Sequence, residues 1–229
     1  IPGRDGLGLD SYRAAFAGGE LGSALLTTTG RSILSTALLV LIAVPAAHSL
    51  ACGALPVRTR RIMVAVTAVL AVVPVQAVAD PLETAFDRLH VLGAPTWLTL
   101  IHVAFGAPFA VLLLRPAFRA IPPRELGRFG GDTERASALT TVVTRGWTTI
   151  LAVAVLEFVF VWNDLVVGLI LSGPQSGSIT LALLGQVRAF TTSSGVLSAG
   201  AVVSMAVPLL LVLVTGRWVV RGLAAGVLR

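Results

Sequence analysis

The sequence contains no lysine, a single cysteine and little charge, with charged residues at 12% of its 229 positions. Without lysine it cannot form a phosphate-binding loop of the Gly-x-x-x-x-Gly-Lys-Ser/Thr type. The lone Cys52 excludes a disulfide within the chain. The three histidines, His48, His90 and His102, are far apart and lack acidic partners at metal-ligand spacing. With no nucleophile elbow either, an enzyme is the least favoured function class, and any energy input must come from a partner.

Long apolar runs are what the sequence has instead. Hydrophobic residues make up 55% of the chain and the mean hydropathy is +0.90, whereas a soluble domain is about 45–50% apolar and about 25% charged. The runs recur at roughly 20 residues, which is long enough to cross about 30 Å of hydrocarbon. We predict an all-α, polytopic transmembrane helical bundle with five spans, near residues 21–52, 62–79, 96–114, 146–171 and 196–220.

The arginines indicate how this bundle is oriented. Segments 58–61, 115–145 and 217–229 each carry a net charge of +3, and in 115–145 six arginines face three acids. The intervening segments 1–20, 80–90 and 172–195 carry −1, −2 and +1. The positive-inside rule places the first group, and with it the C-terminus, in the cytoplasm. Topology explains the basic charge more economically than nucleic-acid binding, so no nucleic-acid partner is expected.

Five spans and a cytoplasmic C-terminus require an external N-terminus. Because the first residue is Ile1 and not methionine, we expect that an earlier span precedes it and that the full protein has six. The alternative is a true five-span protein with an external N-terminus. Residues 80–95 interleave polar and apolar side chains, which predicts a short external helix at the membrane interface.

Two acidic residues fall inside the fourth apolar run. Glu157 and Asp164 are seven positions apart, so on one helix they would share a face. An ionisable group at that depth costs at least about 2.5 kcal/mol, so both should face a cavity or a partner. Arg31 is the basic residue at comparable depth. These groups, with Trp162 and Asn163, either line a translocation path or form a structural interhelical pair beside an interfacial belt.

Other polar or flexible positions in the spans are assigned to packing. We expect His48 and His102 to be satisfied at helix contacts and not to carry protons. Gly106 and Pro108 are expected to mark close packing and a bend.

Four segments resemble those of one protein family. They read LDSYRAAFAGGELGSALLTTTGRS at 9–32, FGAPFAVLLLRPAFRAIPPREL at 105–126, FVWNDLVVGLILSG at 160–173 and RWVVRGLAAGVLR at 217–229. In this order they resemble the carbohydrate-type permeases of ABC importers, inner-membrane subunits similar to the second permease of maltose transporters. The resemblance implies the type I importer permease fold with six spans.

The resemblance also implies partners and a location. The chain would work with a second permease subunit, two ATPase subunits that hold ATP and Mg, an external substrate-binding protein and a sugar-like substrate. It would hold no cofactor itself, and it would be a multi-pass protein in the lipid bilayer of the bacterial inner membrane.

Residues 115–145 then correspond to a cytoplasmic coupling loop. The family's loop enters a groove of the ATPase with a short helix that follows an I-P-x-E-L stretch. The residues that match this stretch are Ile121, Pro122, Arg124, Glu125 and Leu126.

The centre of the loop departs from the family pattern. The expected E-A-A triplet is absent, and Gly130, Gly131 and Asp132 replace its D-G pair. Adjacent glycines weaken a helix by about 1 kcal/mol each. We therefore expect the helix to begin at Asp132 or Thr133 and to include Glu134, Arg135 and Ala136.

Three alternatives stay open. The departure in the loop is compatible with a coupling-deficient permease paralogue or a membrane scaffold that transports nothing. Similar permeases could also serve a non-sugar solute. An enzyme embedded in the membrane is the third and the weakest.

Overall fold

A computed structural model of the chain describes residues 9–52, 55–91, 94–122, 132–171, 177–188 and 194–224, and for 132–138 and 188 it describes the backbone alone. This part of the chain is helical and contains no strand, which confirms the predicted all-α class. The elements are α1 (Leu9–Ala17), α2 (Glu20–Cys52), α3 (Val57–Val72), the 3-10 helix η1 (Val75–Val78), α4 (Ala79–Arg88), α5 (Pro95–Arg119), α6 (Asp132–Trp162), α7 (Val166–Leu171), α8 (Ile179–Arg188) and α9 (Ser194–Ala224).

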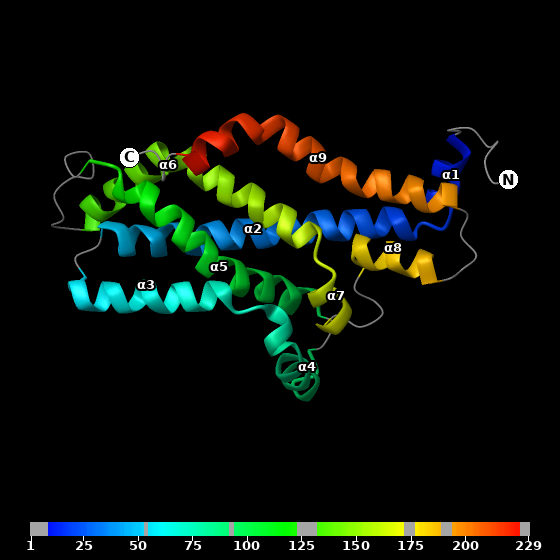
Figure 1. The fold of residues 1–229 in the computed structure, drawn as a ribbon, viewed down its shortest axis with the longest axis horizontal. Helices are drawn as coiled ribbons and strands as arrows, with labels where there is room; N and C mark the ends of the chain where they lie inside the picture. Colours follow the sequence, from blue (N-terminus) through cyan, green and yellow to red (C-terminus); the bar gives the residue numbers. More distant parts are fainter. Residues whose placement is uncertain are drawn as a thin grey trace.

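Four helices in this part of the chain are long and apolar enough to cross a membrane. They are α2, α5, α9 and the Leu139–Trp162 part of α6, and the pair Val57–Val72 and Val75–Arg88 makes a fifth span if it is counted as one. The long helices run lengthwise beside one another (Figure 1). This confirms a polytopic membrane bundle, with four or five spans among the described residues.

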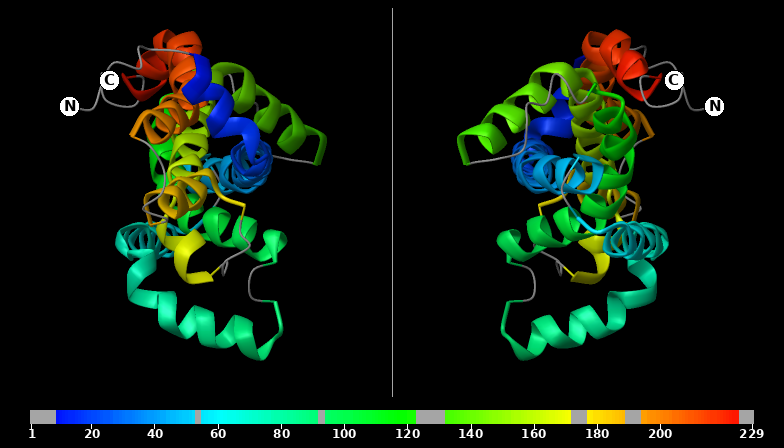
Figure 2. Two further views of the ribbon diagram at one scale, coloured as in Figure 1. Left: turned by 90° about the vertical axis from the view of Figure 1, so that its right-hand side faces the viewer. Right: turned by 90° about the vertical axis from the view of Figure 1, so that its left-hand side faces the viewer.

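The second predicted span is interrupted. A helix was expected over 62–79, but α3 ends at Val72 and the chain bends by 90° into η1 and α4. The cause is Pro74, which has no N–H to continue the helical ladder; the backbone at Val73 and Pro74 is extended. The predicted short helix within 80–95 is present as α4, which stands apart from the main bundle in both end views (Figure 2).

The fourth predicted span is also interrupted. The helix α6 ends at Trp162, and residues 163–165 separate it from α7. The expectation that Glu157 and Asp164 share one helix face is therefore wrong, because Asp164 lies beyond the end of α6.

The core forms around α2, which packs against α5 and α6. Leu39, Ala43 and Ala47 are fully buried at intervals of four residues and form one stripe of α2. The small alanines let the backbones approach closely. Leu114 and Phe118 of α5, both fully buried, belong to the same cluster. A separate cluster joins α4 to α5 and α7 through residues such as Phe86 and Leu98.

Candidate functional site

A break in the fourth apolar run carries the first part of the site. Asp164 stands between α6 and α7, and its two carboxylate oxygens accept hydrogen bonds from the backbone N–H groups of Val167 (3.2 Å) and Gly168 (3.1 Å). The carboxylate thus acts as a side-chain cap at the start of α7 and satisfies amides that lack a helical acceptor. Asp164 thus lies between two helices and caps the second one.

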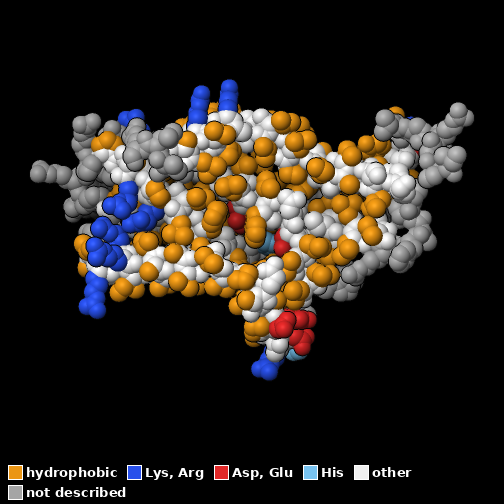
Figure 3. Space-filling view, viewed as in Figure 1, with side chains coloured by type: hydrophobic (Ala, Val, Ile, Leu, Met, Phe, Trp, Pro, Cys, Tyr) orange, Lys and Arg blue, Asp and Glu red, His pale blue; other side chains and the backbone are white. Residues whose placement is uncertain are grey.

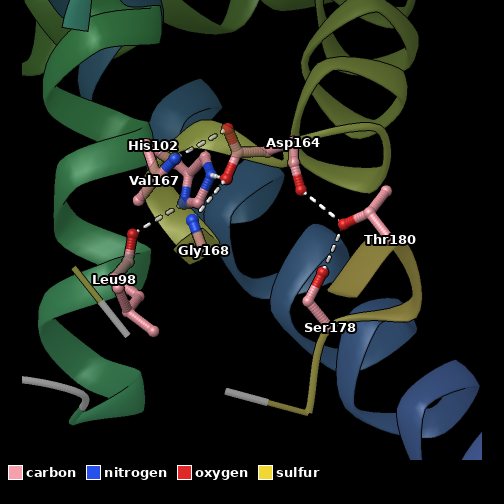
Figure 4. A network of polar contacts seen from close by, with 7 residues as sticks. All are labelled: Leu98, His102, Asp164, Val167, Gly168, Ser178 and Thr180. Carbon is pink, nitrogen blue, oxygen red and sulfur yellow. Dashed lines mark hydrogen bonds and ion pairs between the residues drawn. The ribbon is translucent and has the colours of Figure 1, made fainter. Parts of the chain in front are cut away.

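The same carboxylate meets a buried histidine of α5. Nε2 of His102 lies 3.3 Å from Oδ2 of Asp164, and His102 is 2% exposed. Its Nδ1 lies 2.7 Å from the carbonyl oxygen of Leu98, which can only accept, so Nδ1 carries a hydrogen. Nε2 is thereby turned toward the carboxylate of Asp164. Figure 4 shows this chain of contacts from α5 to the start of α7.

Further contacts tie the break to α8 and α2. Thr180 Oγ1 donates to the backbone oxygen of Asp164 (2.7 Å) and lies 2.6 Å from Ser178 Oγ. Because the Thr180 hydrogen is used, the Ser178 hydroxyl donates in that pair. The neighbouring N–H of Ile179 donates to Thr28 Oγ1 on α2 (2.9 Å). Asp164 therefore joins α5, α7 and α8 (Figure 4).

The second part of the site is a cavity of about 480 Å³ beside Glu157. Its walls come from α2, the end of α3, the Val73–Pro74 break, η1, α5 and α6. Gln76 and Glu157 are its polar side chains, and Phe105, Phe109 and Phe160 are its aromatic ones. In the space-filling view, acidic and histidine atoms lie at the bottom of a hollow in the middle of the face (Figure 3).

Glu157 is buried, with 6% of its surface exposed, and a glycine on the neighbouring helix makes room for its side chain. The Glu157 side chain faces Gly106 on α5, where any β-carbon would meet the Glu157 carboxylate. Its Oε1 has no hydrogen-bond partner among the described residues. A buried carboxylate oxygen without a donor is costly. One wall of the cavity thus carries a carboxylate with an acceptor that no described residue uses.

Electrostatic interactions connect the two parts. His102 interacts with both Glu157 and Asp164, and Arg31 interacts with Asp164. The rings of His102 and Phe160 are in edge contact at 6.4 Å between centroids, so the histidine lies behind the cavity wall. Arg31 itself lines a separate cavity of about 320 Å³ between α2 and the start of α5.

Trp162 does not face this cavity. It is 2% exposed, stacks on Phe158 and donates from Nε1 to the carbonyl oxygen of Ser204 on α9 (3.0 Å). That carbonyl would ordinarily accept from the residue four positions later, which is Pro208 and has no N–H. The indole supplies the missing donor and fixes α6 to α9.

Asn163 is exposed at the end of α6, where its Nδ2 donates to the carbonyl oxygen of Val159 (2.8 Å). Of the five residues predicted for the path, Glu157 lines the cavity and Asp164 lies behind it with His102. Trp162 and Asn163 make helix-terminal contacts. Among the described residues, no group of three side chains could hold a metal ion.

The sequence interpretation missed Gln76, Thr180 and the role of His102 beside Asp164. His102 was assigned to a helix contact, and it does bond the Leu98 carbonyl of its own helix. A lone histidine in an apolar run is the signal that could have indicated a buried acidic partner.

The predicted coupling residues are only partly described. Ile121 is 8% exposed, belongs to the main core cluster, and is followed by Pro122 after α5. Arg124, Glu125, Leu126, Gly130 and Gly131 lie outside the described residues. The helix α6 is described from Asp132 onward, and its backbone includes Glu134, Arg135 and Ala136.

Both ends of segment 115–145, the predicted coupling loop, are packed against other helices. At the start, Phe118 of α5 is fully buried, and a β-carbon at Gly146 of α6 would lie 2.7 Å from its ring. Further along, Thr149 Oγ1 donates to the carbonyl oxygen of Gly222 on α9 (3.0 Å). Segment 115–145 is thus anchored in the core on both sides.

No model of a protein family matches the chain. The chain is 29% identical to the alpha-glucoside transport system permease protein AglG of Rhizobium meliloti over 229 residues, 95% of this chain and 59% of that protein. It thus spans less than two thirds of that relative's length. It is 29% identical to the osmoprotective compounds uptake permease protein GgtD of Synechocystis over 222 residues, 95% of this chain and 74% of the relative.

A third relative is the putative ABC transporter permease protein ORF1 of Streptomyces antibioticus. It is 30% identical over 167 residues, which are 71% of this chain and 71% of that protein. These similarities confirm the resemblance that the four sequence segments indicated, and the all-α bundle with its membrane-length helices agrees with them. The chain therefore belongs to the family of ABC transporter permeases.

Proposed function

We propose that the chain is the transmembrane permease subunit of an ATP-driven, binding-protein-dependent importer of sugars or sugar-like solutes, and that it forms half of the translocation path. It transports and does not catalyse. ATP and Mg would be held by two partner ATPase subunits, a second permease would complete the path, and an external binding protein would deliver the solute. The protein would lie in the bacterial inner membrane with a cytoplasmic C-terminus.

The cavity beside Glu157 carries this proposal. A sugar presents hydroxyl groups that can donate to a carboxylate or an amide, and C–H faces that pack on aromatic rings. Glu157 and Gln76 supply the first kind of partner, and Phe105, Phe109 and Phe160 supply the second. The alpha-glucoside permease similar to this chain supports a sugar substrate.

A second candidate is a non-sugar solute. The relative named for osmoprotective compounds is as similar to this chain as the alpha-glucoside permease. Uncharged polar solutes of that kind would use the same donor and acceptor groups.

Uptake by the reconstituted complex tests the cavity assignment. The permease pair, its ATPases and the binding protein are placed in proteoliposomes, and ATP-dependent uptake of an alpha-glucoside and of an osmolyte is measured. Glu157→Gln replaces one carboxylate oxygen by an amide nitrogen, so the KM of the transported solute should rise about 10-fold or more. Glu83→Gln on exposed α4 is the matched control and should leave the KM unchanged. Equal kinetics of the two variants would overturn the assignment.

The coupling loop, 115–145, is the second element of the proposal. An ATPase that moved this segment would move α5 and α6, since Ile121 and Phe118 belong to the core cluster and Gly146 packs on Phe118. Both ends of the segment would then bias the bundle between outward- and inward-facing states.

Deleting residues 130–138 tests this element. Uptake should be lost while the protein still inserts into the membrane, and a chain with Gly and Ser at these positions separates lost contacts from a shortened loop. Normal uptake after the deletion would contradict the coupling assignment. An unaltered chain that binds the ATPase but never transports would favour the coupling-deficient paralogue or scaffold.

A further inference from the structure

Four arginines converge at one end of the bundle, away from the cavity beside Glu157. Arg60 and Arg61 lie in the first turns of α3, and Arg115 and Arg119 lie in the last turns of α5, which packs against α3. They line a pocket of about 410 Å³. Figure 3 shows the basic side chains gathered over this end of the molecule.

These charges are close enough to act on one another. The charges of Arg119 and Arg60 both act unfavourably on Arg115. Among the described residues, no aspartate or glutamate forms an ion pair with any of the four. Like charges held together in this way favour an anion between them.

The position of Arg115 is fixed by the end of α2. Its Nε donates to the carbonyl oxygen of Leu50 (3.3 Å), in the last turn of that helix, where a positive charge is favoured. This bond uses one of the five N–H donors of the guanidinium group. The remaining donors can bind an anion from a side chain that is already oriented.

The floor of the pocket is apolar. It continues from Arg61 along Val64, Ala65 and Ala68, which follow at intervals of three and four residues on one face of α3. The alanines leave a shallow groove beside exposed neighbours such as Val69, which is 66% exposed. The pocket thus has a basic end and an apolar end, arranged along the axis of a membrane-crossing segment.

We propose that this pocket binds an anionic phospholipid of the phosphatidylglycerol class. The phosphate lies among Arg60, Arg61, Arg115 and Arg119, and one acyl chain lies along Ala65 and Ala68. Basic pockets between transmembrane helices suit such headgroups. An acidic protein segment would match the arginines but would leave the apolar groove unused, so a lipid is the better fit.

Native mass spectrometry of the purified complex in mild detergent tests this site. Phosphatidylglycerol and phosphatidylcholine with identical acyl chains are added at equal concentration, and the bound lipid is counted. The unaltered complex should retain phosphatidylglycerol preferentially, and an excess of inorganic phosphate, which lacks an acyl chain, should not displace it. Each arginine contributes about a fivefold factor, so Arg60→Gln with Arg61→Gln should lower the preference about 25-fold.

Two variants serve as controls. Arg58→Gln removes a charge from the same turn of α3 outside the pocket and should leave the preference unchanged. Replacing Arg60 and Arg61 together by lysine keeps the charge and should retain most of the preference for phosphatidylglycerol. Equal retention of both lipids, or the same loss in Arg58→Gln as in the double variant, would overturn the proposal. Cross-linking of Arg61→Cys to an acidic partner segment, with no lipid retained, would overturn it as well.

Discussion

Gly106 on α5 lies directly against the carboxylate of Glu157 on α6. A β-carbon at position 106 would meet Oε2 of Glu157 and would lie 2.6 Å from Cδ1 of Leu39. Gly106→Ala should therefore displace the carboxylate, lower the free energy of unfolding by about 1–3 kcal/mol and reduce uptake. Thermal unfolding in detergent and uptake in proteoliposomes measure the two effects.

The matched control for this prediction is Gly216→Ala, since a β-carbon at position 216 of α9 would meet nothing within 4 Å. Shortening the acid with Glu157→Asp in the Gly106→Ala background should recover part of the stability, because the two positions are coupled. A Gly106→Ala protein as stable as the Gly216→Ala control would contradict the contact.

Asp164 combines two roles that substitutions can separate. Asp164→Ala removes both the cap of α7 and the partner of His102, whereas Asp164→Asn keeps a capping side chain. Loss of the cap costs about 0.5–2 kcal/mol, and breaking a buried pair costs about 3–5 kcal/mol. Asp164→Ala should thus be the less stable variant in denaturant unfolding.

A double-mutant cycle isolates the histidine contact. His102→Gln, Asp164→Asn and the double variant should show a coupling energy of about 0.5–3 kcal/mol. A coupling energy near zero would mean that the two side chains do not interact.

The tryptophan of the fourth run should affect stability and not substrate affinity. Trp162→Phe removes the donor to Ser204 and should destabilise the protein by about 1 kcal/mol, with an unchanged KM for uptake. Pro208→Ala supplies a backbone N–H to the same carbonyl, so it should reduce the cost of Trp162→Phe. A raised KM in Trp162→Phe would instead place the indole on the translocation path.

The contact between the end of α9 and the middle of α6 depends on Gly222. A β-carbon there would meet the backbone of Thr148 and would lie 2.9 Å from Cα of Thr149. Gly222→Ala should separate the helices, break the bond from Thr149 Oγ1 and cost about 1–3 kcal/mol of unfolding free energy. Chemical denaturation of Gly222→Ala beside the Gly216→Ala control measures this loss of stability. Equal denaturation midpoints of the two variants would refute the prediction.

Apolar length alone predicted the architecture, because a run of twenty apolar residues has few alternatives to a membrane helix. It failed at the two breaks, where one or two residues decide the backbone. Pro74 ends a helix through a missing donor, and Asp164 starts one through its side chain. A hydropathy window averages over such single positions.

The site was predictable in part for the same reason. Glu157 is conspicuous as an acid in an apolar run, and burial beside a cavity follows from its cost in hydrocarbon. Its neighbours are not conspicuous, since His102 and Asp164 are far apart in sequence and meet only when α5 packs against the α6–α7 break. Pairings of this kind come from tertiary structure and leave no local pattern.

The break between α3 and η1 has a consequence for the solvent. The 16 residues of α3 rise about 24 Å, less than the roughly 30 Å of hydrocarbon, and its arginines hold its first turns at the surface. Val73 and Pro74 therefore lie at a depth where extended backbone is tolerated only inside protein or against water. Since both line the cavity beside Glu157, we expect that cavity to hold water before a solute binds. A solute on the proposed path would then displace this water, and each of its hydroxyl groups would have to replace a hydrogen bond that the water made.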